Sequence, residues 1–113
     1  MTYLSVVLFA VAAVGGATLV VRKFTGKGMP LSLAAVHGIF AAAGLITLAA
    51  SVYNNSSNKL MNISLILFLI VALGGFILLS YHLRKKAHPV ALIGIHGAGA
   101  VVSFLLLLAA VFG

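Results

Sequence analysis

The stretch PLSLAAVHG at residues 30–38 recurs as PVALIGIHG at residues 89–97. The shift of 59 residues that aligns these two stretches aligns the rest of the chain without a gap, and 16 of 54 aligned pairs are identical. Self-similarity at a fixed period indicates an internal repeat, with one copy at residues 1–54 and the other at 60–113. Besides the Pro, His and Gly of the quoted stretches, the identical pairs include Gly15/Gly74, Gly16/Gly75, Ser5/Ser64, Phe9/Phe68, Ala41/Ala100 and Leu48/Leu107.

The composition indicates an integral membrane protein. Of the 113 residues, 64% are hydrophobic and 6% are charged, and the chain contains no aspartate or glutamate. A soluble domain carries about 25% charged residues. The net charge of +7 is concentrated in two short connections rather than in a basic patch with interleaved aromatic residues. We therefore expect a lipid bilayer and no nucleic acid as the partner.

Four apolar stretches each reach the length of about 20 residues that a helix needs to cross a bilayer. They cover about Thr2–Val21, Leu31–Tyr53, Leu60–Leu83 and Val90–Phe112. We predict an all-α fold, a four-helix transmembrane bundle that forms one integral membrane domain over residues 1–113. Each repeat is one helical hairpin, so the two tandem copies are parallel and related by a pseudo-two-fold axis along the membrane normal.

The basic residues predict the orientation of the bundle. The first and third connections contain all but one of them, whereas the second contains only Lys59. By the positive-inside rule the first and third connections face the cytoplasm, and both termini lie outside it. The expected location is a multi-pass protein of the bacterial inner membrane. The six basic residues of the two connections are Arg22, Lys23, Lys27, Arg84, Lys85 and Lys86.

The residue types that are missing narrow the chemistry. Without cysteine there are no disulfides, thiolate metal sites or covalent haem attachment, and without carboxylates there are no acid pairs and no oxygen-rich cation cage. The chemistry must therefore come from histidine or from no side chain.

The repeat keeps one histidine per copy, His37 and His96, on the same face of its helix. The shared residues of the second span follow one another by three, four, four, seven and four positions, which traces one helical face that we expect to point inward. They are Pro30, Leu33, His37, Ala41, Leu48 and Val52, with Pro89, Leu92, His96, Ala100, Leu107 and Val111 as their counterparts.

Two imidazoles at one depth are a bis-histidine ligand set, and histidine is a standard axial ligand of haem. We expect His37 and His96 to ligate the metal of one b-type haem, with small residues leaving room for the flat macrocycle. The expected cofactor-binding residues are His37, His96, Gly16, Gly75, Gly38, Gly97, Ala41 and Ala100. This layout resembles the architecture of small membrane b-type cytochromes, which implies electron transport rather than a stand-alone enzyme.

Other functions stay open. The histidines could pack without a cofactor in a structural or accessory subunit of a larger complex or a homo-oligomer, or they could bind copper, for which Met29, His82 and His88 are additional ligands. A small transporter is the third alternative. Under the haem hypothesis the redox partner is a quinone or another membrane subunit. Phe9 and Phe68 are expected to be packing residues.

Overall fold

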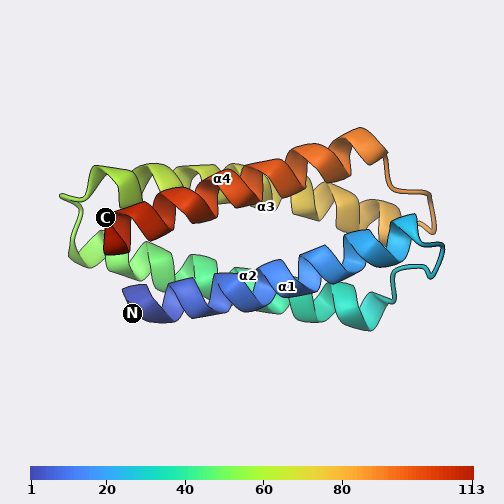
Figure 1. The fold of residues 1–113 in the computed structure, drawn as a ribbon, viewed down its shortest axis with the longest axis horizontal. Helices are drawn as coiled ribbons and strands as arrows, with labels where there is room; N and C mark the ends of the chain where they lie inside the picture. The colour runs from blue at the N-terminus through green and yellow to red at the C-terminus, as the bar shows by residue number, and fades with distance from the viewer.

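The computed structural model describes residues 1–113 as four helices joined by short loops (Figure 1). They are α1 (Thr2–Phe24), α2 (Leu31–Asn54), α3 (Lys59–Leu83) and α4 (Val90–Phe112). All four are long and apolar enough to cross a membrane, and there are no strands. The bundle is 44 Å long, which is close to the thickness of a bilayer with its headgroups, about 40–45 Å. The predicted all-helical architecture with four spans is confirmed.

The helices form a ring in which each contacts two neighbours. The contacts are most extensive between α1 and α2 and between α3 and α4, so each half of the chain is a hairpin. The two hairpins meet through α2 with α3 and through α1 with α4. Consequently α1 faces α3 across one diagonal of the bundle, and α2 faces α4 across the other.

The two ends of the bundle differ in what they contain (Figure 1). The N-terminus, the C-terminus and the α2–α3 loop lie at one end, and the α1–α2 and α3–α4 loops lie at the other. We call the half nearest the termini the terminal half, and the half nearest the two lysine- and arginine-containing loops the basic half.

The helix ends follow from the local sequence. Pro30 and Pro89 have extended backbones and precede α2 and α4 as their N-caps, one position before the first helical turn in which they were expected. Asn58 caps α3, because its side-chain oxygen accepts a hydrogen bond from the backbone N–H of Met61.

Helices α1 and α3 end in the same way. Lys27 N–H donates to Arg22 O at 2.9 Å, and Lys86 N–H donates to Tyr81 O at 2.9 Å. This six-to-one bond belongs to the Schellman motif, which requires a residue in the left-handed region. Gly26 has that role after α1, with φ of 74°, but after α3 it falls to Lys85, with φ of 56°. The second turn therefore contains a strained lysine where the first has a glycine.

The packed core lies entirely in the terminal half. Only 11 of the 113 residues are buried, as expected where the outer surface meets lipid. Phe9 of α1 and Phe68 of α3 stack in parallel across one diagonal, with ring centroids 3.9 Å apart, which confirms that they are packing residues. Every buried residue lies in the terminal half, and these are Ser5, Phe9, Ala12, Gly44, Leu48, Ser51, Met61, Ser64, Phe68, Ser103 and Leu107.

Buried hydroxyl groups join the helices around this core. Ser5, Ser64 and Ser103 have no exposed surface. Ser64 Oγ donates to Ser103 O at 2.8 Å between α3 and α4, and Thr2 Oγ1 donates to Ser51 Oγ at 3.1 Å between α1 and α2. Hydrogen bonds of this kind hold membrane helices together, because lipid offers no hydrophobic drive for association.

The predicted inward face of α2 and α4 is confirmed beyond the first residue of the series. Leu48 and Leu107 are completely buried, and His37 and His96 are half-buried. Pro30, in contrast, is exposed at the entrance to α2.

Candidate functional site

The two repeated histidines meet across the bundle. His37 lies on α2 and His96 on α4, two helices that face each other across a diagonal. Their ring centroids are 6.3 Å apart and the ring planes are nearly perpendicular, at 84°. The structure therefore brings together the two residues that the repeat singled out.

Each imidazole is fixed by a backbone carbonyl of the neighbouring helix. His37 Nδ1 lies 2.7 Å from Ala12 O on α1, and His96 Nδ1 lies 2.9 Å from Val71 O on α3. A carbonyl only accepts, so we assign the hydrogen of the neutral ring to Nδ1, which leaves a lone pair on Nε2. Neither Nε2 has a hydrogen-bond partner in the protein, and neither is an unsatisfied buried atom, so both are accessible.

This arrangement is the one in which histidine binds metals. A ligating imidazole commonly donates its other N–H to a backbone carbonyl, which fixes both the tautomer and the ring orientation. Two imidazoles that hold one metal from opposite sides at about 2 Å would have ring centroids roughly 6 Å apart. The observed separation of 6.3 Å is compatible with a shared ion.

The glycine pairs make room for the histidine rings. A Cβ added at Gly16 would lie 2.9 Å from His37 Cε1, and one added at Gly75 would lie 3.0 Å from His96 Cε1. Gly15 and Gly74 also border these side chains. The glycines that were expected to clear space for a macrocycle thus form recesses that the imidazoles occupy.

The other small residues that the sequence proposed for the site lie elsewhere. A Cβ at Gly38 or Gly97 would meet nothing within 4 Å, so these positions border open space rather than the histidine rings. Ala41 and Ala100 are half-buried, one turn from the histidines toward the terminal half.

The histidine pair lies where the packed core ends. Ala12, whose carbonyl holds His37, is 4% exposed and is the last buried residue of α1 in this direction. From this level to the two basic loops no side chain is buried. The site therefore has a rigid floor on the terminal side and no packed core on the basic side.

The protein supplies only two strong metal ligands here. No group of three or more His, Cys, Asp or Glu side chains occurs anywhere in the structure. A metal at this site would take its remaining ligands from a cofactor or from solvent.

A groove between α3 and α4 reaches His96 from the lipid-facing side. It has a volume of about 310 Å³, and its wall includes Val71, Gly74 and Gly99. A Cβ at Gly99 would lie 2.8 Å from Val71 Cγ2. The corresponding residue of the first repeat is Phe40, so the two hairpins differ in side-chain volume beside their histidines.

The basic half contains a second histidine pair, which the sequence placed at the membrane edge without predicting contact. The ring centroids of His82 and His88 are 5.5 Å apart. The pKa of His88 in the loop is lowered from its usual 6.5, first by burial and then by the charges of His82 and Lys23. An uncharged imidazole is therefore favoured at this position.

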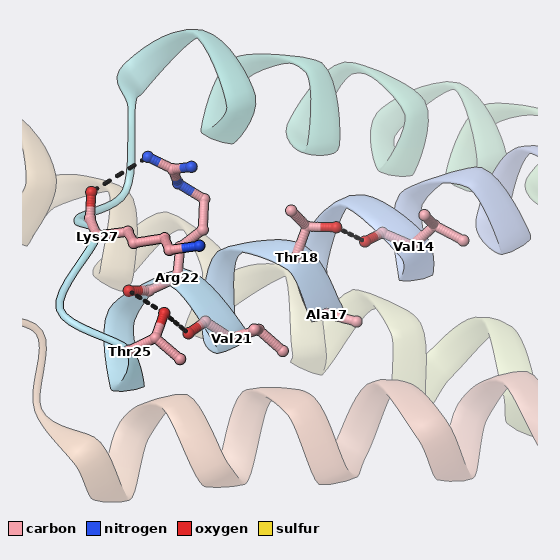
Figure 2. Close-up of a pocket in the computed structure, with 7 residues that line it drawn as sticks. All are labelled: Val14, Ala17, Thr18, Val21, Arg22, Thr25 and Lys27. Atoms are coloured by element: carbon pink, nitrogen blue, oxygen red, sulfur yellow. Dashed lines mark hydrogen bonds between the residues drawn. The ribbon is translucent and has the colours of Figure 1, made fainter.

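The arginines of the two loops are held differently. Arg22 donates from Nε to Gly28 O at 2.9 Å and from Nη2 to Lys27 O at 3.1 Å, and Figure 2 shows the second of these bonds. Arg84 instead lies 4.9 Å over the ring of Tyr81 and bonds Ser80. All these cations are without a carboxylate partner, because the chain has none.

Sequence reasoning identified the histidines and missed their anchors. Ala12 O and Val71 O are backbone atoms, so no side-chain pattern marks them. Their one signal is positional, since each lies 25 residues before its histidine and the two are equivalent positions of the repeat.

Compared with protein-family profiles, curated protein sequences and solved structures, the chain matches none of them.

Proposed function

We propose that this protein is a membrane electron carrier that binds one b-type haem between His37 and His96. The observation that carries the proposal is the paired geometry. Two imidazoles 6.3 Å apart are each fixed through Nδ1 and present an unpartnered Nε2. Nothing in the packing of the helices requires both Nε2 atoms to be free.

The equivalence of the two halves supports a shared occupant. Both histidines bond the carbonyl 25 residues earlier, and the core residues Phe9/Phe68 and Leu48/Leu107 are equivalent pairs. We infer that the bundle is a duplicated hairpin with a pseudo-two-fold axis along the membrane normal. Such an axis would present the two imidazoles symmetrically to one metal.

The surroundings fit haem better than a bare ion. A bare metal with two protein ligands would need water or further side chains in an apolar span, whereas a porphyrin brings four nitrogen ligands of its own. The basic half has no packed core, and its loops contain six of the seven basic residues. Those cations would bind the two propionates by charge-assisted contacts. Haem held in this way supplies one-electron chemistry.

The chain's own residues decide the type of chemistry. With both axial positions taken by His37 and His96, no position would remain for oxygen, which favours electron transfer over oxygen activation. The donor and acceptor would be a quinone or another membrane subunit, since four spans and short loops leave no domain for a soluble substrate. We infer that the basic loops face the cytoplasm and that the termini lie outside it, in a bacterial inner membrane.

The test is an absorption and electron paramagnetic resonance spectrum of the detergent-extracted full chain, after expression with a haem supply. We expect a Soret band, a sharp α-band on reduction and a low-spin ferric signal. His37→Ala and His96→Ala should each abolish the low-spin signal. His82→Ala and His88→Ala are the matched controls, because they remove the other histidine pair, and they should leave the spectrum unchanged.

A colourless protein would contradict the proposal, as would equal haem loss in the control variants. Copper without a Soret band would indicate the alternative in which the imidazoles hold copper.

The glycine recesses favour a second candidate, an accessory subunit without a cofactor. Gly16 and Gly75 accept the imidazole edges so closely that the histidines could act as packing and hydrogen-bonding residues alone. This candidate predicts stoichiometric partner subunits after mild extraction. It also predicts that these partners persist when His37 and His96 are replaced by glutamine.

A further inference from the structure

A shallow groove runs along the outer side of α1 toward the basic end. It has a volume of about 540 Å³ (Figure 2). Its wall along the helix consists of Val14, Ala17, Thr18 and Val21, all exposed, and its end consists of Arg22, Thr25 and Lys27. It lies apart from the histidine pair, which neighbours Gly15 and Gly16 on α1.

The length of this groove is apolar in spite of its threonines. Thr18 Oγ1 donates to Val14 O at 2.7 Å and Thr25 Oγ1 donates to Val21 O at 2.7 Å, so both hydroxyl hydrogens are used within α1 (Figure 2). From Val14 to Val21 the helix rises about 10 Å. This surface suits a hydrocarbon chain that lies parallel to the helix.

The end of the groove is cationic and partly preorganised. The guanidinium of Arg22 is fixed by the carbonyls of Gly28 and Lys27, which use Nε and Nη2 and leave Nη1 free. Gly28 has φ of 75°, a conformation that favours glycine. Figure 2 shows the Lys27 side chain reaching back from the loop toward Arg22. Two cations therefore converge where the groove meets the membrane surface.

No group in the protein neutralises these two cations. The chain carries +7 and no aspartate or glutamate, so any counter-charge must come from outside it. At the end of a lipid-facing helix, the available anions are lipid headgroups, and juxtamembrane cations bind them.

We propose that the groove on α1 binds one anionic phospholipid. Its phosphate contacts Arg22 and Lys27, and one acyl chain lies along Val14, Ala17 and Val21. The second hairpin does not repeat this site. The position equivalent to Arg22 is Tyr81, and Arg84 is stacked on its ring.

The experiment is native mass spectrometry of the full chain released from detergent micelles that contain equal amounts of phosphatidylglycerol and phosphatidylcholine. We expect one phosphatidylglycerol to be retained in preference to phosphatidylcholine. Arg22→Gln with Lys27→Gln should weaken that retention about 30-fold, as the loss of two interfacial cations implies. The matched control is Arg84→Gln with Lys85→Gln, which removes the same charge from the other loop and should retain the lipid.

Three results would overturn the proposal. Equal loss in both double variants would show diffuse charge attraction, and retention without headgroup preference would show that the cations do not select the lipid. Competition by inorganic phosphate alone would show that the apolar wall contributes nothing. Ala17→Phe, which fills the groove without altering charge, should also lower retention, and unchanged retention there would contradict the placement of the acyl chain.

Discussion

The terminal half and the basic half of the bundle are built by different means. In the terminal half, stacked phenylalanines, two buried leucines and serine hydroxyls hold four helices around a closed core. In the basic half no side chain is buried, and the contacts are imidazoles in glycine recesses and loops held by arginine. The difference teaches that assembly and chemistry are assigned to separate levels of the same helices. If so, substitutions in one half should leave the other half largely unaffected.

The largest expected effect comes from filling a histidine recess. Gly75→Leu places its Cβ about where His96 Cε1 requires space, at 3.0 Å, and should displace the ring from Val71 O. We expect loss of haem binding with little change in helicity, measured by absorption and circular dichroism. A readout independent of haem is faster exchange of the His96 Nδ1 hydrogen by nuclear magnetic resonance. Gly94→Leu, at a position with nothing within 4 Å, is the control and should bind haem normally.

Next in size is the loss of a core side chain. Leu107 is completely buried, so Leu107→Ala should lower the free energy of unfolding by about 1–3 kcal/mol, the packing part of a cavity-forming change. Unfolding by sodium dodecyl sulfate measures this change. Leu79→Ala in the basic half, where the leucine is 37% exposed, should cost within about 0.5 kcal/mol. Similar losses at both positions would remove the distinction between the halves.

A smaller gain is expected at the turn after α3. Lys85→Gly relieves a left-handed lysine and should raise the free energy of unfolding by about 0.5–1 kcal/mol. Lys86→Gly removes the same charge without relieving a positive φ and serves as the control. A gain in both variants would point to charge repulsion among the loop cations instead of backbone strain.

The smallest expected effect is a pH dependence at the basic end. Because the pKa of His88 is lowered from 6.5 in the folded protein, the unfolded chain binds more protons there. Stability should therefore fall slightly as the pH drops below 6.5. Titration by nuclear magnetic resonance should show the low pKa, and His82→Gln should restore only part of it, since burial is the larger cause. A pKa at or above 6.5 would contradict this assignment.

Much of the fold could be predicted from the sequence, because apolar runs of this length have one structural solution in a bilayer. The inward face of α2 and α4 was also predictable, since the repeat retains what the interior constrains and lipid tolerates any apolar residue. The meeting of His37 and His96 followed from the same face.

What the sequence could not supply depends on tertiary geometry. The carbonyl of Ala12 carries no signal in a side-chain pattern, and Gly16 does not reveal whether its space goes to a ring or a macrocycle. The asymmetry between the halves was also hidden, because apolar residues fill both ends of each span. Only their packing shows that Phe9 and Leu48 form a core, whereas Leu33 does not.

The parallel stack of Phe9 on Phe68 has a consequence for permeation. Rings 3.9 Å apart across the diagonal leave no passage for a water molecule between them, so the stack plugs the central axis of the bundle. Ions and water cannot travel from one membrane face to the other along this line. Any proton that reaches the imidazoles must then enter and leave through the end that carries the lysines and arginines, or sideways from the lipid.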